Sequence, residues 1–297
     1  MLELNGTAFG ALQQSYGGDT FNTAVYLSRC GGGVIKPWYA TALGDDALSL
    51  ELERRWAQDG LGLDLVRHIP GRMPGLYQIQ VDAQGERHFS FWRDNSAAKA
   101  YFDITETPLE ARINEWNAFY FSGISLAILP VDGRSRLLAI AQALRTRGAT
   151  VVFDNNYRPS LWPNITVARD CFSRAFAVAD TALITADDHQ ALFGLTSLKA
   201  AVAAAQALDV FEVVIKRGEA PTLVRSGSSP WHSVPTQTVA NVVDTTAAGD
   251  SFAAGYLSRR LRGKPPVEST RFGNRLAARV IAHRGAIIPL EAMDDLL

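Results

Sequence analysis

The 297-residue sequence contains only two cysteines, Cys30 and Cys171. Two cysteines cannot form a disulfide framework, which excludes the small disulfide-stabilised secreted scaffolds and favours a reducing cytoplasm. There is no run of about 20 apolar residues and no basic-then-apolar signal sequence, so no membrane span and no secretion are predicted. The formal net charge is only -1, which gives no general attraction to nucleic acid or to an anionic membrane. Any anionic ligand must therefore be held by a local site.

Several motifs of other protein classes are also missing. No G-x-G-x-x-G fingerprint follows a predicted strand, which argues against a dinucleotide oxidoreductase. The glycines at 31–33 lack the lysine and the serine or threonine of a phosphate loop, so they are predicted to end a helix. The five histidines are scattered along the chain without the spacing of metal ligands, and no zinc site is predicted.

Apolar runs alternate with helical patterns along most of the chain, which favours an α/β fold with a parallel sheet covered by helices on both faces. Ligands of such sheets bind at the carboxyl ends of the strands. The predicted strands are Pro37–Ala42, Ala118–Ser122, Thr150–Asp154, Thr181–Thr185 and Glu212–Arg217, and the predicted helices are Ala47–Gln58, Arg134–Arg147, Ile165–Ala179 and Leu198–Leu208.

One region departs from this alternation. Leu76–Val81 and Glu86–Arg93 alternate in residue type about turn residues 82–85, which predicts a β-hairpin. A period of two places Phe91 and Arg93 on one apolar face, although Arg93 is equally well explained as an exposed arginine that ends the strand. Because a two-stranded ribbon is marginally stable alone, we expect it to join strands near 4–16 in a small sheet that closes over the main domain.

The segment 241–261 predicts an anion site, since a short apolar pair leads into small residues and then a helix; it reads NVVDTTAAGDSFAAGYLSRRL. The backbone amides of Ala247, Ala248 and Gly249 can approach a bound anion there, and the helix adds its positive end. The charge of Asp250 would repel a bound phosphate, whereas a phosphoryl-transfer enzyme needs a base at this place. The alternative is an aspartate that only interacts with the helix dipole.

Two strings carry a resemblance that covers nearly the whole chain: GGDTFN at 17–22 and DTTAAGDSFAAGY at 244–256. They resemble the two signatures of the ribokinase-like (PfkB) carbohydrate kinases. The resemblance implies a single domain over 1–297, a three-layer α/β/α fold with a mostly parallel central sheet and a small β-sheet lid from segments 4–16 and 71–94. In these kinases a strand precedes the segment that matches Met1–Leu4, so we expect the first core strand to be missing here.

Further strings are similar to the family members that act on 2-keto-3-deoxygluconate, an acidic sugar: PGLYQI, FWR, SGISLAIL, FDNNYRPSLW and RGAIIP. The resemblance implies that ATP phosphorylates the C6 hydroxyl of this sugar, with Asp250 as the base, Ala247, Ala248 and Gly249 as the anion hole, and Mg²⁺ beside the phosphates. Two arginines suit a carboxylate, which a guanidinium binds with two hydrogen bonds. The implied sugar-binding residues are Gly17, Gly18, Asp19, Asn22, Tyr77, Phe91, Arg93, Arg158 and Asp250.

The resemblance is less specific on the nucleotide side. It implies contacts to ATP from Asn156, Lys216, Gly218, Glu219, Gly249 and Asn274. The metal-linked NxxE pattern of the family appears as 185–188, so Asp188 is expected near Mg²⁺ through water, unless Asp187 and Asp188 only complement a helix dipole. The family also implies a monovalent cation, K⁺, near Asp244, which the spacing here does not establish.

The implied partners are the acidic sugar, ATP and further copies of the chain, as a dimer through the lid edges or a higher oligomer. Neither nucleic acid nor a membrane is expected. Two alternatives stay open: a kinase of a neutral sugar, of the fructokinase or ribokinase type, and a sugar or nucleotide sensor on the same fold that has no turnover.

Overall fold

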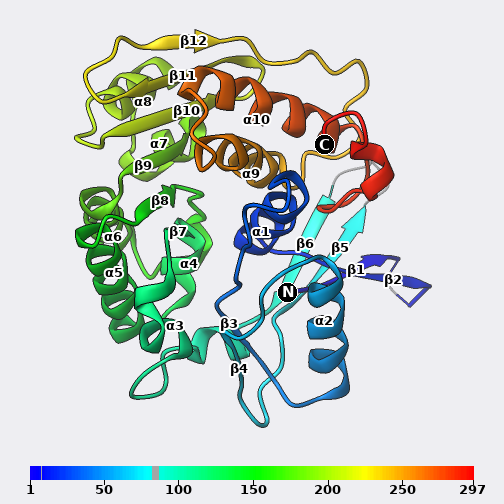
Figure 1. The fold of residues 1–297 in the computed structure, drawn as a ribbon. Coiled ribbons are helices and arrows are strands. Elements are labelled where there is room, and N and C mark those ends of the chain that lie inside the picture. The colour runs from blue at the N-terminus through cyan, green and yellow to red at the C-terminus, as the bar shows by residue number, and fades with distance from the viewer. Residues whose placement is uncertain (8, 82–86) are drawn as a thin grey trace.

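A six-stranded sheet, ordered β12-β11-β10-β9-β8-β7, forms the centre of the molecule (Figure 1). The computed structural model describes residues 1–7, 9–81 and 87–297. Strands β7 to β10 run parallel with the predicted bounds, and the antiparallel β11 and β12 extend the sheet beyond them. The strands are β7 (Ala118–Ser122), β8 (Thr150–Asp154), β9 (Thr181–Thr185), β10 (Glu212–Arg217), β11 (Ala220–Ser226) and β12 (His232–Val234).

Side chains of the parallel strands alternate between two separate cores, as a period of two requires. One face packs against α5 and α6, and the other against α1, α9 and α10, so the predicted three-layer α/β/α arrangement is confirmed (Figure 1). The first face buries Phe121, Val151, Phe153, Ala182, Ile184, Val213 and Ile215. The second face buries Val152, Leu183, Val214 and Val224.

The helices include all four that the sequence predicts, with starts or ends shifted by at most a few residues. No helix within the described ranges is both long enough and apolar enough to cross a membrane. The helices are α1 (Asp19–Cys30), α2 (Ala47–Gln58), α3 (Pro108–Ala111), α4 (Gly123–Ile128), α5 (Val131–Thr146), α6 (Ile165–Val178), α7 (Ala186–Phe193), α8 (Leu198–Gln206), α9 (Ala248–Arg260) and α10 (Pro266–Ile281), with short 3-10 turns at Ala97–Ala100, Ile113–Glu115, Pro159–Leu161 and Leu290–Met293.

The predicted hairpin is present and belongs to a separate four-stranded sheet in the order β2-β1-β5-β6. Strands β5 (Leu76–Val81) and β6 (Arg87–Trp92) pair antiparallel, and β1 (Leu2–Gly6) joins them to β2 (Leu12–Tyr16). The expected turn at 82–85 lies outside the described residues. We call this four-stranded sheet the lid; it lies beside α1 and the start of α9 (Figure 1).

The predicted strand Pro37–Ala42 forms only in part: Trp38 makes an isolated bridge to Gly62, and the continuous strand includes only the last two residues of the predicted range. The chain forms β3 only at Thr41–Leu43, which pairs with β4 (Val66–His68) in a sheet of its own. Pro37 has no amide hydrogen to donate to a ladder, and Trp38 instead packs against Trp116 with ring centroids 5.5 Å apart. The apolar run therefore serves side-chain packing at this point. The expectation that a first core strand is missing stays a prediction.

The start of α9 is held in an uncommon backbone conformation. Ala247 is the residue that precedes the helix, and its φ of 60° lies in the left-handed region. A side chain at such a φ costs roughly 1–2 kcal/mol. Among the described residues, Asn156 at φ 21° and Phe9 at φ 59° are the other non-glycine residues with positive φ. Two of these three belong to the predicted site, which is where proteins often retain backbone strain.

We expect Ala247→Gly to raise the free energy of unfolding by up to ~1 kcal/mol, because the strain relieved exceeds the ~0.4–1 kcal/mol of extra chain entropy that glycine gives the unfolded state. Urea denaturation followed by circular dichroism measures this difference. Ala248→Gly is the matched control, since Ala248 lies within the helix and its replacement should not stabilise. Equal destabilisation by both substitutions would contradict the expectation.

Candidate active site

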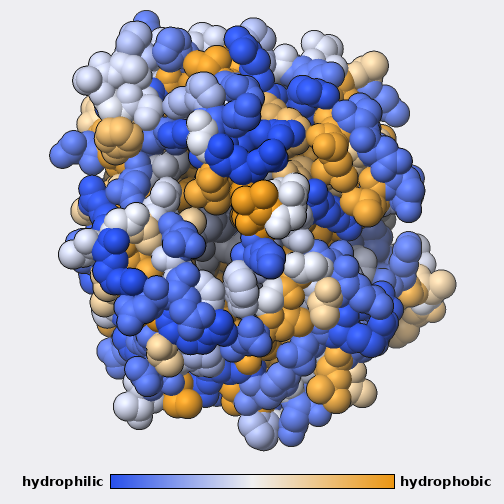
Figure 2. All heavy atoms as spheres, viewed as in Figure 1, coloured by the Kyte–Doolittle hydropathy of each residue, from blue (hydrophilic) through white to orange (hydrophobic). Residues whose placement is uncertain are grey.

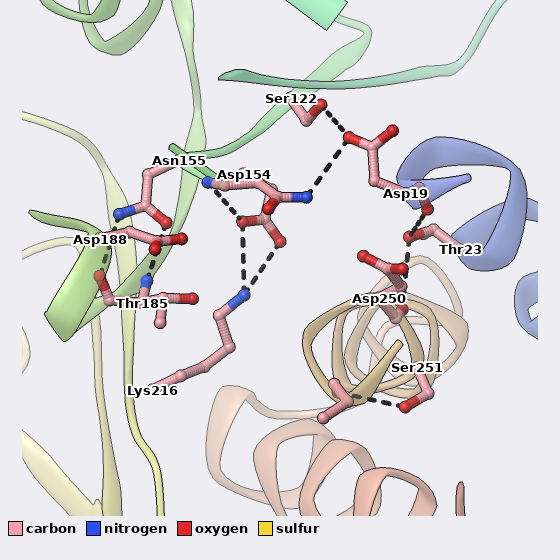
Figure 3. A network of polar contacts seen from close by, with 12 residues as sticks. Asp19, Thr23, Ser122, Asp154, Asn155, Thr185, Asp188, Lys216, Asp250 and Ser251 are labelled. Carbon is pink, nitrogen blue, oxygen red and sulfur yellow. Dashed lines mark hydrogen bonds and ion pairs between the residues drawn. The ribbon is translucent and has the colours of Figure 1, made fainter. Parts of the chain in front are cut away.

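Asp250 lies in the first turn of α9, against the start of α1. Its Oδ2 accepts a hydrogen bond of 2.8 Å from Nδ2 of Asn22, and Oδ1 of Asn22 in turn accepts from the amide of Gly18 at 3.2 Å. Gly18 has a φ of 155°, which only glycine adopts readily. The hydroxyl of Thr23 donates to the carbonyl oxygen of Asp250 at 3.3 Å. The two family-like strings, more than 200 residues apart, therefore meet directly (Figure 3).

Asp19 is a second half-buried carboxylate of the site. Its Oδ2 accepts hydrogen bonds from the hydroxyl of Ser122, at the end of β7, and from Nδ2 of Asn156 at 3.4 Å. Asn156, which is predicted to bind the nucleotide, thus lies beside Asp19, which is predicted to bind the sugar. Both contacts come from the carboxyl ends of parallel strands, where ligands of such sheets bind.

Asp154 and Lys216 form an ion pair that is almost inaccessible to solvent. Nζ of Lys216 lies 3.0 Å from Oδ2 and 3.3 Å from Oδ1 of Asp154, with side chains 11% and 3% exposed. A Cβ atom added to Gly249 would lie 3.5 Å from the same Nζ. The ammonium group therefore lies next to the loop of Ala247, Ala248 and Gly249 at the start of α9 (Figure 3), which we call the anion loop. Its charge suits a phosphate there.

The anion loop is fixed by its own turn and by Asp244. Oδ1 of Asp244 accepts from the amide of Thr246 and Oδ2 accepts from the amide of Gly285, both at 2.9 Å. The amide of Ala248 donates to the carbonyl of Thr245 at 3.2 Å, so it is engaged within the turn. Asp244 thus ties the loop to the segment that follows α10.

Burial of several carboxylates near one ammonium sets the electrostatics of the site. Burial raises the pKa of Asp250 to about 7, the negative charge of Asp19 adds to this effect, and the hydrogen bond from Asn22 opposes it. Burial also raises the pKa of Asp19, against the hydrogen bond from Ser122. A carboxylate with a pKa near neutrality is a better proton acceptor than an ordinary one.

The lid contributes Tyr77 and Phe91 to the site, and Arg93 follows directly after β6. The hydroxyl of Tyr77 donates to the buried carboxylate of Glu3 and lies 3.8 Å from where a Cβ of Gly17 would be. Burial raises the pKa of Tyr77, and the charges of Glu3, Asp244 and Asp250 add to the effect. The rings of Tyr77 and Phe91 share one face of the lid, with centroids 5.9 Å apart.

The two predicted carboxylate-binding arginines are both electrostatically coupled to Asp19. The guanidinium of Arg93 lies 4.1 Å from the centre of the Phe91 ring, and burial lowers its pKa while the charges of Asp94 and Asp19 oppose that shift. Asp19 also feels the charge of Arg158. Arg158 is 50% exposed and pairs with Asp188, with Nη1 at 3.3 Å from Oδ2.

The remaining residues that are predicted to bind the nucleotide lie at the turn between β10 and β11 and on α10. Gly218 has a φ of 59°, and Glu219 is exposed beside it, with its carbonyl oxygen accepting from the hydroxyl of Thr236 at 2.5 Å. Asn274 is buried; its Oδ1 accepts from Thr222 at 2.9 Å and its Nδ2 donates to the carbonyl of Pro235 at 3.0 Å. Asn274 is therefore committed to bonds inside the fold and is not brought to the carboxylates.

Sequence reasoning did not single out Glu3, Ser122 or Asp154 as site residues. Asp154 had a usable signal, since it is the last residue of a buried strand and is charged. Glu3 had none, because its partner Tyr77 is 74 residues away. Figure 2 shows a hollow near the centre of the face seen in Figure 1, in the region of α1, the start of α9 and the ends of β7 and β8.

The similarity of the chain to known proteins shows its family. Residues 3–293 match the pfkB family carbohydrate kinases. The chain belongs to this family. The kinase is 42% identical over 290 residues to the 2-dehydro-3-deoxygluconokinase of Dickeya dadantii, which is 95% of this chain and 92% of the relative. It is 40% identical over 299 residues to the protein of the same name from Haemophilus influenzae, covering 100% of this chain and 95% of that relative.

The fold of the kinase is also that of solved structures. The fructokinase of Xylella fastidiosa, solved with bound ATP, has a TM-score of 0.82 and 23% identity, and the alignment covers 100% of this chain and 95% of that one. At this identity the likeness concerns the fold alone. It confirms the ribokinase-like architecture that the two signature strings imply.

The raised pKa of Asp250 predicts how activity and stability change with pH. If Asp250 accepts a proton in the reaction, kcat/KM should rise as the pH increases through about 7 and then level off, because only the carboxylate form is a base. A pH profile of initial rates measures this. A profile that is flat from pH 5.5 to about 8.5 would contradict the assignment.

Stability should change in the opposite sense. The pKa in the folded state lies above the ordinary value of 3.8, so the favourable contribution of Asp250 is complete below that value and is lost as the pH rises through about 7. Asp250→Asn removes this loss, since each pKa unit corresponds to ~1.4 kcal/mol. The melting temperature of the variant should therefore exceed that of the wild type by more at pH 8 than at pH 5. The same gain at both values would refute the assignment.

Proposed function

We propose that this kinase transfers the γ-phosphoryl group of ATP to the C6 hydroxyl of 2-keto-3-deoxygluconate. The observation that carries the proposal is the position of Asp250, half-buried at the start of α9, hydrogen-bonded to Asn22 and next to Gly249, which lies beside the ammonium of Lys216. Relatives named 2-dehydro-3-deoxygluconokinase that match at 38–42% identity support the choice of sugar.

In the proposed reaction Asp250 accepts the proton of the C6 hydroxyl while the hydroxyl oxygen bonds to the γ-phosphorus. The bond from that phosphorus to the bridging oxygen breaks, and ADP leaves with its electron pair. Since a carboxylate is a modest base, positioning and charge stabilisation supply most of the rate. The amides of Ala247, Ala248 and Gly249 are the proposed anion hole; that of Ala248 must share its hydrogen with Thr245 or leave it.

The phosphate side of the site is proposed to hold ATP and Mg²⁺. Lys216 stands beside the anion loop, where its charge suits the β- and γ-phosphates. Gly218 and Glu219 lie between β10 and β11, after the strand that carries Lys216. Asn156 lies beside Asp19, and Asn274, on α10, is proposed to support the part of the site that holds the adenine of ATP. Mg²⁺ neutralises phosphate charge during such transfers. Within the described residues no three acidic, histidine or cysteine side chains group to hold a metal, which fits an ion bound through phosphate and water.

The sugar side is proposed to recognise both hydroxyls and the carboxylate. Gly17, Gly18, Asp19 and Asn22 surround the place for hydroxyls, with Tyr77 and Phe91 as a wall from the lid. Arg93 and Arg158 are proposed to bind the carboxylate. A guanidinium matches the two oxygens of a carboxylate, which supports this role.

We also propose an oligomer, a monovalent cation site and a cytoplasmic location for this protein. The lid edges are proposed to join copies of the chain, supported by Leu12 and Trp92, which are 45% and 58% exposed. Asp244 and the neighbouring loop are proposed to lie beside K⁺. The two buried free cysteines support a cytoplasmic location, where thiols stay reduced.

Replacing the base tests catalysis directly. Asp250→Asn should reduce turnover by about two to four orders of magnitude, the usual contribution of a general base, and leave ATP binding almost unchanged. A coupled ADP-release assay and calorimetric titration of ATP measure the two quantities. Glu268→Gln is the matched control, since Glu268 is an exposed acid in the first turn of α10.

Turnover of Asp250→Asn close to that of the wild type would mean that the carboxylate only interacts with the helix dipole. If the wild type released no ADP with any sugar, a sensor on this fold would be the better description. Testing 2-keto-3-deoxygluconate, its galactonate epimer, fructose and ribose in parallel separates the acidic sugar from a neutral one.

The arginine pair tests the carboxylate. Arg93→Ala and Arg158→Ala should each raise KM for the acidic sugar about 10- to 100-fold, the loss expected for a charged hydrogen bond, with a far smaller change for a neutral sugar. Steady-state kinetics with both sugars measures the difference. Arg174→Ala is the matched control, because Arg174 is also 50% exposed and paired with an aspartate. Equal effects on both sugars would remove the carboxylate role.

A further inference from the structure

The family pattern assigns Asp188 to the metal, but the structure places it against Arg158. Nη1 of Arg158 lies 3.4 Å from Oδ1 and 3.3 Å from Oδ2 of Asp188, and it also donates to the carbonyl oxygen of Tyr157 at 2.8 Å. The Asp188 side chain is 21% exposed, so the pair is partly shielded from water. Asp188 thus contacts the residue proposed to bind the sugar carboxylate.

The two partners are held in register by a side chain between them. Asp188 lies in the first turn of α7, directly after β9, whereas Arg158 follows β8. Nδ2 of Asn155 donates to the carbonyl oxygen of Thr185 at 3.0 Å, and its Oδ1 accepts from the amide of Thr185 at 2.9 Å (Figure 3). These two hydrogen bonds fix the loop after β8 to the start of α7. The ion pair between Arg158 and Asp188 therefore has a rigid support.

The charges around Asp188 do not favour a metal ligand. Two positive groups, Arg158 and Lys216, oppose the effect of burial on the pKa of this carboxylate, and the negative charge of Asp154 adds to that effect. A divalent cation on either oxygen would stand beside a guanidinium, which repels it. Among the described residues, Asp188 belongs to no group of three acidic, histidine or cysteine side chains that could hold a metal ion.

We propose that Asp188 is a positioning residue that orients the Arg158 guanidinium toward the carboxylate of the acidic sugar. The contacts of Arg158 within the described chain all use Nη1. Anchored there, the guanidinium presents its Nε and Nη2 edge, which matches the two oxygens of a carboxylate. The inference rests on the proposed function, because it requires an anionic sugar.

Preorganisation explains what the pair contributes. A half-exposed arginine otherwise loses rotamer freedom when the sugar binds, and a partner that already fixes the side chain removes most of this loss. The expected benefit is a modest factor in sugar affinity, with little influence on the chemical step.

The test measures sugar binding without nucleotide or metal. Calorimetric titration of 2-keto-3-deoxygluconate in the presence of EDTA should show a Kd about 3- to 10-fold weaker for Asp188→Asn than for the wild type, as loss of ordering implies. In the Arg158→Ala background the same substitution should have no further effect. In steady state, KM for the sugar should rise while kcat and the Mg²⁺ concentration for half-maximal rate stay near the wild-type values.

Asp187→Asn is the matched control, because Asp187 carries the same charge in the same helical turn and is exposed. It should leave the Kd unchanged, and melting temperatures establish that each variant is folded. An unchanged Kd for Asp188→Asn together with a higher Mg²⁺ requirement would overturn the proposal in favour of the metal role. Equal weakening with and without Arg158 would overturn it in favour of a general structural role. A wild type that does not bind the acidic sugar overturns the proposed function as well.

Discussion

The ion pair between Lys216 and Asp154 is the contact on which the rest of the site depends. It joins the ends of β10 and β8 across the intervening β9, in a place from which water is nearly absent. A lone buried charge would be costly, and removal of one partner usually destabilises strongly. Because the positive charge of Lys216 offsets the negative charge of Asp154, the carboxylates of Asp19 and Asp250 can lie nearby. The same ammonium group also faces the anion loop.

The fold supplies this arrangement from both sides of the sheet. One core fixes the strand ends that carry Ser122, Asp154 and Lys216, and the other fixes α9, which carries Asp250, together with the second half of α1. The start of α1, which carries Asp19 and Asn22, packs in a third core through Phe21 and Val25. The site lies at the meeting of the two layers, so neither core alone determines it. The lid then adds Tyr77 and Arg93 from a third, smaller unit of structure. Catalytic and sugar-recognising groups are thereby placed on different elements.

The sequence predicted β7 to β10 with their bounds, because buried parallel strands are short apolar runs between helices and leave a strong pattern. Pro37–Ala42 showed a similar run but forms only an isolated bridge at Trp38 and a short strand from Thr41, because apolar content alone does not reveal how far the partner segment extends. Asp250 was recognisable from its local string. The pairing of Asp188 with Arg158 was not, because the spacing along the chain carries no information about which charges meet, and the pattern at 185–188 suggested a metal instead.

The hydrogen bonds of Asn22 have one more consequence. Its amide oxygen receives the Gly18 N–H, so its nitrogen must face Asp250, and that nitrogen donates to Oδ2. The hydrogen bond from Asn22 uses one of the two lone pairs of Oδ2 and makes this oxygen less basic. In the proposed reaction the proton is therefore directed to Oδ1, and the two oxygens of one carboxylate have unequal duties: one anchors the side chain and the other does the chemistry.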